Sequence, residues 1–335
     1  MSGAGVRCAV VGAGAWGTAL AELLARNGHD TVLWAREPDV VDGVNARHEN
    51  ARFLPGAALA PSLRATGDVR AAVRGRAFVL FAPPSHVLRA VAVSAADAVE
   101  PGATLAVASK GIERDTLAVM TDVVADAVSG RSVVAVSGPS FAAEVARRQP
   151  TAIVAACTDP AAATLAQSLL GTPEFRVYTH DDVLGVELGG ALKNVMAVAT
   201  GMLEGLGLGF NSRAALITRG LAEMTRLGVA LGARASTFAG LTGMGDLVLT
   251  CTGALSRNRA VGEEIGRGRS LAEVLTGRET VAEGVLNAQS ARALAERAGV
   301  EMPIVNAVHG ILFEGAPVGD AVRDLMTRAP RAEQD

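Results

Sequence analysis

Two lysines are the first candidates for chemistry in this chain, because Lys110 and Lys193 are the only lysines among 31 basic residues. An ammonium group can lose its proton near neutral pH and a guanidinium group cannot, so these lysines are candidates for proton transfer. Gly189, Gly190 and Ala197 share the side of a predicted helix with Lys193. Such small neighbours would exclude water, and desolvation lowers the pKa of a lysine, so we expect Lys193 to act as a general acid or base. The alternative is a surface lysine lying over a glycine-rich packing seam.

A second group of polar residues is suited to bind an anion. Ser256, Arg257 and Asn258 come directly before a helical pattern over 260–266. With Ser256 as the N-cap, the N–H groups of the first turn, the Arg257 guanidinium and the Asn258 amide can converge on one phosphate. The alternative is an ordinary capped helix with solvated arginines. Asp246 lies in a glycine-rich stretch that we expect to form a loop, where it is either a site residue or a simple cap.

A glycine motif near the N-terminus predicts a dinucleotide-binding turn. Gly12, Gly14 and Gly17 form G-x-G-x-x-G between a predicted strand and a predicted helix. The first glycine permits a tight turn, the second lets the backbone approach a pyrophosphate, and the third allows the helix to pack on the sheet. The helix N-terminus then offers N–H groups and partial positive charge to the phosphates.

The residues at the end of the second predicted strand decide between NADP and NAD. An arginine there accommodates a 2′-phosphate, whereas an acidic residue binds the ribose 2′-hydroxyl. This chain has Arg36 followed by Glu37. We therefore predict that NADP is preferred and that NAD is possible, with Glu37 either a solvated charge or a ribose partner.

Alternating strands and helices position these groups in the first part of the chain. Helical stretches are predicted at 15–27, 87–99 and 115–128, and strands at 6–11, 31–34, 77–82, 104–108 and 133–136. This alternation predicts a Rossmann-type, doubly wound α/β domain with a parallel sheet covered on both faces. Further segments at 152–156, 161–170 and 175–178 are expected to extend this domain. Lys110 would then lie at the carboxyl edge of the sheet, where ligands of open α/β folds bind.

The pattern becomes helical near residue 185. Helices are predicted at 186–203, 213–231, 257–266, 288–298 and 304–313. We therefore expect a dinucleotide-binding domain over residues 1–185 and an all-α catalytic and substrate domain over residues 186–335.

Composition excludes several other classes of protein. Hydrophobic residues make up 50% of the 335 residues, charged residues 19% and aromatic residues 3%, and the net charge is −3. Such a chain is globular, and neither its charge nor its aromatic content suits a nucleic-acid binder. The three cysteines and five histidines have no metal-binding spacing, so no metal is assigned. No apolar run reaches the length of a membrane span, and scattered cysteines fit a reducing cytoplasm.

Taken together, these motifs resemble the bacterial-type NAD(P)-dependent glycerol-3-phosphate dehydrogenase family. The resemblance runs in the expected order over residues 6–315. It is carried by GAGAWGTA at 12–19, APPSH at 82–86, SKG at 109–111, SGPSFA at 137–142, GALKNV at 190–195, NSRAALITRG at 211–220, GDLVLTCT at 245–252, SRNR at 256–259 and VAEG at 281–284. A series of this kind is far more specific than the glycine turn alone.

The resemblance implies the interconversion of dihydroxyacetone phosphate and sn-glycerol 3-phosphate, which supplies glycerophospholipid synthesis. By matching position, Lys193 would be the proton donor or acceptor. The implied substrate residues are Lys110, Gly138, Ser140, Asp246, Ser256, Arg257 and Asn258. The implied cofactor residues are Gly12, Gly14, Ala15, Trp16, Gly17, Arg36, Phe53, Lys110, Ala142, Arg257, Val281 and Glu283. Ala15 stands where the family often has serine, and Glu37 stands where a second basic residue often follows.

Two other functions fit parts of this pattern. One is another lysine-based NADP-dependent dehydrogenase that acts on a 3-hydroxy acid, but the anion site at 256–258 favours a phosphate substrate. The other is a non-catalytic NADP-binding protein, which leaves Lys193 unexplained. The resemblance and the helical second part also predict a homodimer, and the composition described above predicts a cytoplasmic protein that binds neither nucleic acid nor membrane.

Overall fold

The computed structural model describes residues 5–128, 131–277, 282–329 and 332. Its chain divides into two compact units. Unit 1 comprises residues 1–190 and 233–246, and unit 2 comprises residues 191–232 and 247–335. Two helices, α8 (Val183–Gly205) and α11 (Asp246–Thr252), contain residues of both units.

Unit 1 is built on an eight-stranded sheet with the strand order β3-β2-β1-β4-β5-β6-β7-β8. All neighbouring pairs are parallel except β6 and β7, which are antiparallel. The strands are β1 (Arg7–Val11), β2 (Asp30–Trp34), β3 (Arg64–Thr66), β4 (Phe78–Phe81), β5 (Thr104–Val107), β6 (Val133–Ser137), β7 (Thr151–Ala156) and β8 (Phe175–His180). The carboxyl ends of β1, β4, β5 and β6 therefore face one edge of the sheet, because these four neighbours are mutually parallel.

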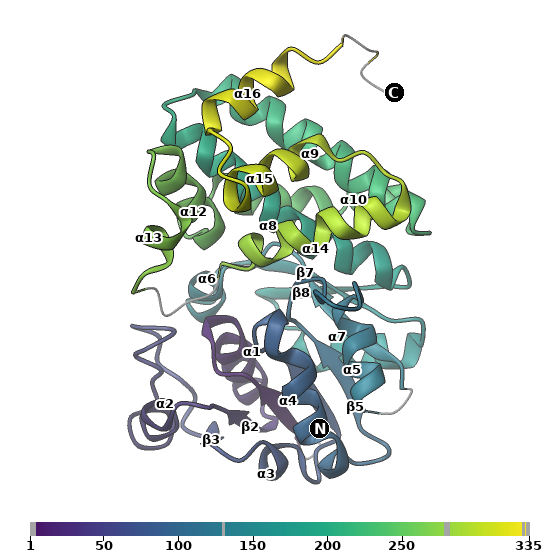
Figure 1. Cartoon of the computed structure of the whole chain (residues 1–335). Helices are drawn as coiled ribbons and strands as arrows, with labels where there is room; N and C mark the ends of the chain where they lie inside the picture. Colours follow the sequence, from purple (N-terminus) through teal and green to yellow (C-terminus); the bar gives the residue numbers. More distant parts are fainter. Residues whose placement is uncertain (1–4, 129–130, 278–281, 330–331, 333–335) are drawn as a thin grey trace. The chain divides into compact units, whose positions relative to one another are not determined.

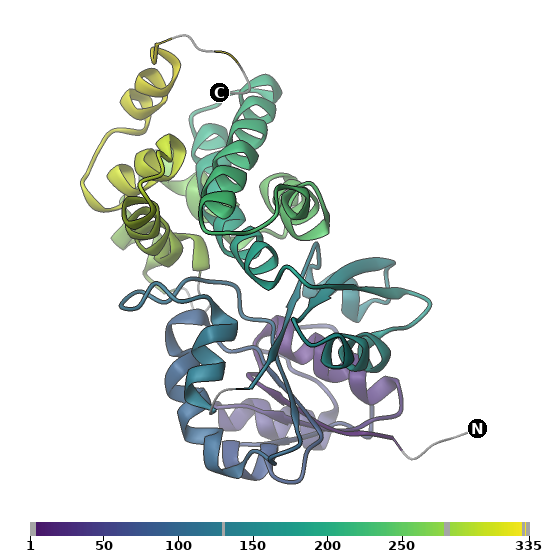
Figure 2. The same cartoon turned by 90° about the vertical axis from the view of Figure 1, so that its right-hand side faces the viewer.

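Helices cover both faces of this sheet (Figure 1). In the rotated view, α4 and α5 lie on one side of the strands, and α1 and α7 lie on the other (Figure 2). The helices of unit 1 are α1 (Ala15–Arg26), α2 (Pro38–Asp42), α3 (Val69–Val73), α4 (Leu88–Ala95), α5 (Met120–Ala127), α6 (Ala142–Ala146), α7 (Pro160–Leu170) and α10 (Ala235–Phe238). A π-helical turn, η4 (Leu241–Gly245), leads into α11.

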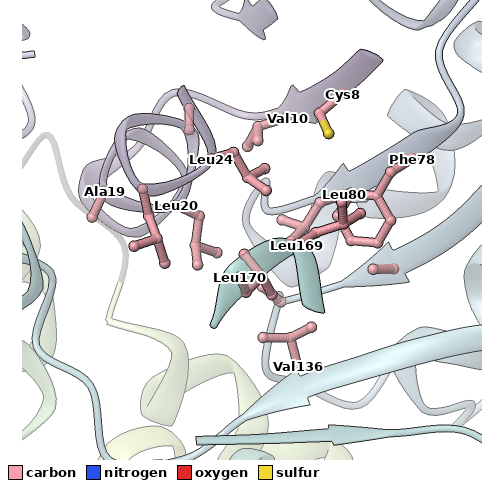
Figure 3. Packing of buried hydrophobic residues seen from close by; sticks show 14 of the residues in the cluster. Cys8, Val10, Ala19, Leu20, Leu24, Phe78, Leu80, Val136, Leu169 and Leu170 are labelled. Carbon is pink, nitrogen blue, oxygen red and sulfur yellow. The ribbon is translucent and has the colours of Figure 1, made fainter. Parts of the chain in front are cut away.

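The core of unit 1 is aliphatic, as the low aromatic content predicts. Leu20 and Leu24 of α1 pack with Leu80 of β4 and Leu169 of α7, and all four side chains are buried (Figure 3). A second buried cluster lies on the other face of the sheet and includes residues of α4 and α5. These two layers fix the strand ends that carry the glycine turn and Lys110.

Unit 2 is helical. Besides parts of α8 and α11, it contains α9 (Phe210–Ala230), α12 (Arg257–Gly266), α13 (Leu271–Leu275), α14 (Glu283–Ala298), α15 (Pro303–Phe313) and α16 (Val318–Met326). Helices α8 and α12 approach closely through glycines. A Cβ added at Gly201 would lie 2.9 Å from the carbonyl carbon of Arg259, and one added at Gly262 would lie 2.8 Å from that of Val198. We call Gly201, Gly205, Gly262 and Gly266 the glycine seam.

Helix α8 is long and apolar enough to cross a membrane by length and composition. However, 89% of its most apolar 18-residue stretch is buried inside the protein. Burial of this extent is typical of a core helix, and Lys193 and Asn194 lie within it, both buried.

The predicted fold class, a Rossmann-type sheet followed by a helical part, is confirmed. Three local expectations were wrong. The helix predicted over 115–128 begins only at Met120, because residues 114–116 form a turn and Leu117 adopts a positive φ of 60°. Strand β3 was not predicted, and the sheet is not wholly parallel because β7 runs antiparallel to β6.

Candidate functional site

The glycine turn follows β1 directly. Gly12 has a φ of +118°, and a Cβ there would lie 2.7 Å from the backbone nitrogen of Pro83, so the turn must approach the end of β4 closely. Gly14 is the N-cap of α1 and makes no side-chain cap, and among the described residues nothing lies within 4 Å of its added Cβ position. The first turn of α1 is therefore open to an anion, which fits the pyrophosphate of a dinucleotide.

Two further features of the turn fit a bound cofactor. Ala15 and Trp16 form the first turn of α1, and the Trp16 indole N–H is buried without a hydrogen-bond partner in the described part of the chain. A buried donor of this kind is costly unless something pairs with it. Asn50 donates one hydrogen bond to the Ala13 carbonyl oxygen (2.9 Å) and accepts one from the Phe53 backbone N–H (3.1 Å). Phe53 is thereby tethered to the glycine turn.

Arg36 lies just after β2, in a position to meet the ribose. Its side chain is 81% exposed, and its guanidinium donates two hydrogen bonds to one carboxylate oxygen of Glu37, at 2.8 and 3.0 Å. Glu37 therefore neutralises part of the charge that a 2′-phosphate would use. The pair supports a modest rather than a strict selectivity for NADP.

Lys110 follows β5 at the carboxyl edge of the sheet. Its ammonium donates hydrogen bonds to Asp246 Oδ2 (2.6 Å) and to the Gly138 carbonyl oxygen (3.1 Å). Asp246 is only 1% exposed, so this ion pair is held away from bulk water. The expectation that Asp246 lies in a loop was wrong: the π-helical turn η4 passes directly into α11, of which Asp246 is the first residue.

The loop after β6 completes this part of the site. Gly138 has a φ of +140°, which favours glycine, and Ser140 donates its hydroxyl hydrogen bond to the Gly138 carbonyl oxygen (3.0 Å). Ala142 begins α6 a few residues later. Lys110, Asp246, Gly138 and Ser140 thus form one connected polar group within unit 1.

Lys193 lies in unit 2, where it is 8% exposed. Its ammonium donates a hydrogen bond of 2.7 Å to the Thr250 hydroxyl oxygen, and Thr250 is itself buried. The alternative of a solvated surface lysine is therefore wrong.

Ser256 caps α12 as predicted, accepting a hydrogen bond from the Arg259 backbone N–H (3.2 Å). Arg257, the first residue of that helix, is exposed and is therefore accessible to an anion.

Asn258 forms more hydrogen bonds within the protein than its place in the predicted anion site suggests. One of its two amide N–H groups donates to Asn194 Oδ1 (2.9 Å), and its own Oδ1 accepts from the Gly284 backbone N–H (2.9 Å). This bonding joins α8, α12 and the start of α14, where Glu283 interacts electrostatically with Arg257. Val281, another expected cofactor residue, lies outside the described residues.

The structure groups the expected residues into two sets. Unit 1 contains the glycine turn, Trp16, Arg36, Phe53, Ala142 and the group around Lys110, and unit 2 contains Lys193, Ser256, Arg257, Asn258 and Glu283. Sequence reasoning missed Thr250 and Asn194, which bond to Lys193 and Asn258, and also Glu187, which bonds to Thr121. Asn194 directly follows Lys193, but a lone threonine or glutamate carries no spacing signal that would single it out.

Two domain models of one protein family together match almost the whole chain. The N-terminus of NAD-dependent glycerol-3-phosphate dehydrogenase matches residues 7–163, and the C-terminus of the same family matches residues 182–323. The chain belongs to the NAD-dependent glycerol-3-phosphate dehydrogenase family. The predicted resemblance is confirmed.

Individual members of the glycerol-3-phosphate dehydrogenase family agree with this assignment. The chain is 55% identical over 331 residues to the glycerol-3-phosphate dehydrogenase [NAD(P)+] of Geobacter sulfurreducens, covering 98% of this chain and 99% of that protein. The crystal structure of glycerol-3-phosphate dehydrogenase from Coxiella burnetii superposes with a TM-score of 0.93 at 39% identity, covering 97% and 99% of the two chains. The Saccharomyces cerevisiae enzyme gives a TM-score of 0.83 at 26% identity, covering 97% and 100%.

Proposed function

We propose that this protein catalyses the reversible reduction of dihydroxyacetone phosphate to sn-glycerol 3-phosphate, with NADPH preferred and NADH accepted. Family membership supports the reaction, and the relatives are named as enzymes that use NAD(P)+, which covers both cofactors. The observation that carries the mechanism is the burial of Lys193, whose ammonium is directed by its hydrogen bond to Thr250. Residues 1–185 would bind the cofactor, and residues 186–335 would provide the acid–base group and the phosphate site.

Lys193 would act on the oxygen of the ketone. When bound, the nicotinamide supplies or accepts the hydride at C2 of the substrate. As C2 is reduced, negative charge develops on its oxygen, and a protonated Lys193 can stabilise that charge and then donate its proton. In the oxidative direction the neutral amine takes the proton back. The hydroxyl of Thr250 accepts a hydrogen bond from Lys193 and so limits the directions the ammonium can take.

Arg257 would bind the substrate phosphate together with the N–H groups at the start of α12. Ser256 already satisfies one N–H group of this first turn, and Asn258 has one amide N–H left beyond its hydrogen bond to Asn194. These groups would orient the substrate, and orientation alone contributes several kcal/mol, on the order of 7, to a reaction barrier.

Lys110 would serve as a second cation for the substrate or cofactor. Two of its three N–H groups are taken by Asp246 and by the Gly138 carbonyl oxygen. Its third donor is therefore suited to an oxygen of a bound ligand. We also propose that the protein works in the cytoplasm as a homodimer, as its family resemblance and scattered cysteines suggest.

The direct test is the loss of NADPH absorbance when dihydroxyacetone phosphate is added to the purified protein. We expect rapid oxidation of NADPH, slower oxidation of NADH, and little reaction with unphosphorylated dihydroxyacetone. A 3-keto acid serves as the control for the rival class of lysine-based dehydrogenases that act on 3-hydroxy acids. Oxidation with a keto acid and none with dihydroxyacetone phosphate would overturn the proposal.

A further inference from the structure

A small cavity lies beside Lys110 in unit 1. It is lined by Ser109 and Lys110 after β5, by Ser137 at the end of β6, and by Glu187 of α8. The space open to the centre of a water molecule is about 10 Å³. That volume is about the size of a single water site, and such a water needs at least two polar partners.

Ser137 supplies one polar group that needs a partner. The residue is 5% exposed, and within the described chain its buried hydroxyl oxygen has no hydrogen-bond partner. Leaving such a group unpaired costs about 1–3 kcal/mol, so buried hydroxyls normally bind protein or water. The hydroxyl also lies close to Lys110: a Cβ added at Gly190 would be 2.8 Å from Ser137 Oγ and 3.4 Å from Lys110 Cδ. The lysine stem and the serine hydroxyl therefore pack against the same glycine.

Glu187 supplies the second polar group. It is 7% exposed, and its carboxyl accepts hydrogen bonds from the Thr121 backbone N–H (3.0 Å) and the Thr121 hydroxyl at the start of α5. Burial, with a smaller contribution from Asp122 on α5, raises the pKa of Glu187 to about 8. At neutral pH the group is therefore mostly a neutral acid with one O–H donor, which a water molecule in the cavity can accept.

We propose that one water molecule occupies this cavity, accepts a hydrogen bond from the neutral acid of Glu187 and binds the hydroxyl of Ser137, and that this bridge positions the Lys110 side chain for the anionic substrate. Glu187 and Ser137 are then positioning residues that act through Lys110. This inference rests on the proposed function, in which Lys110 binds substrate or cofactor.

Charge explains why the bridge has to be neutral. Lys110 already faces one carboxylate, that of Asp246, at 2.6 Å. If Glu187 lost its proton, its negative charge would be added on α8 beside the cavity, near Asp122 on α5, which already disfavours the charged form of Glu187. The local field would then disfavour a doubly charged phosphate, and like charges in a buried site interact strongly.

The first test compares the KM for dihydroxyacetone phosphate at about pH 7 and at about pH 9 in the wild type and in Glu187→Gln. In this proposal only protein with a protonated Glu187 binds the substrate well, so apparent affinity falls with the protonated fraction. A pKa of about 8 then predicts roughly a tenfold rise in the wild-type KM between pH 7 and pH 9. Glutamine cannot ionise, so its KM ratio should stay below about twofold on the same argument. An equal rise in both proteins would overturn the inference.

The second test removes the other partner. Ser137→Ala should raise the KM for dihydroxyacetone phosphate by about 3- to 10-fold, corresponding to one lost hydrogen bond, with a smaller change in kcat. If Ser137 only supported the fold, Ser137→Ala would lower the free energy of unfolding without changing KM more than kcat. An unchanged KM would overturn the inference.

The water itself can be observed directly, whether or not the variants fold. A high-resolution crystal structure of the wild-type protein near neutral pH should show an ordered water within hydrogen-bond distance of both the Glu187 carboxyl and Ser137 Oγ. A cavity closed by side chains, or a water bound to neither group, would overturn the inference. Failure of the proposed function is distinguishable, because it would appear as absent dihydroxyacetone phosphate reduction by the wild type at pH 7.

Discussion

Replacing Gly262 with alanine tests whether the glycine seam holds α8 against α12. An added Cβ at Gly262 would overlap the Val198 carbonyl group and lie 2.8 Å from its carbon, whereas carbon atoms normally approach to about 3.5 Å. The helices would have to separate or tilt. Overpacking of this kind typically costs about 1–3 kcal/mol, and the collision with a backbone carbonyl places Gly262→Ala at the upper end. The better helix propensity of alanine returns up to about 1 kcal/mol.

We therefore expect Gly262→Ala to lower the free energy of unfolding by about 2 kcal/mol, measured by urea denaturation. The matched control is Gly319→Ala on α16, where no described atom lies within 4 Å of the added Cβ position. The control should be neutral or stabilising by up to about 1 kcal/mol. The Asn194–Asn258 hydrogen bond joins the same two helices, so the KM for dihydroxyacetone phosphate should rise in Gly262→Ala. Equal stability of the two variants would refute this account of the seam.

Three further substitutions test other parts of the account. Arg36→Ala should weaken NADPH binding about tenfold and NADH binding much less, because only NADPH carries the 2′-phosphate. Titration with each cofactor measures the two affinities, and equal losses would contradict this assignment. Arg257→Ala should raise the KM for dihydroxyacetone phosphate by about 10- to 100-fold while the Kd for NADPH stays nearly constant, and parallel changes in both constants would argue against a phosphate role. Glu223 is buried, accepts hydrogen bonds from the backbone N–H groups of Ile304 and Val305, and has its pKa raised by burial to about 7. Glu223 keeps its proton in the folded protein up to about pH 7, whereas in the unfolded protein it loses that proton above its ordinary pKa of 4.5. The free energy of unfolding should therefore fall as pH rises, by about 1.4 kcal/mol per pH unit between pH 4.5 and pH 7. Glu223→Gln should remove this slope, and urea unfolding at pH 5 and pH 7 that shows the same slope in both proteins would exclude it.

Much of unit 1 could be predicted because its signals are local. The strand, glycine turn and helix around Gly12 need only the order of apolar and glycine residues, and they form as expected. The antiparallel pairing of β7 with β6 depends on how distant segments meet, which the apolar pattern of a short strand does not encode.

The site shows the same division between local and distant information. The lysines could be found by their rarity, and Ser256 could be identified as an N-cap from its position before a helical pattern. The partners of Lys193 and Asn258 come from 57 and 64 residues away, and no spacing rule predicts them. Glu187 lies within an apolar helical stretch, where its burial and raised pKa become evident only from the packing of α8 on the start of α5.

The most direct test of the central claim is the turnover number of Lys193→Arg for dihydroxyacetone phosphate and NADPH. Arginine keeps the positive charge but cannot deliver its proton, so turnover should fall by about 10²- to 10⁴-fold while circular dichroism and the Kd for NADPH stay close to wild type. Turnover near that of the wild type in a folded Lys193→Arg protein would contradict the claim that the buried amine transfers the proton.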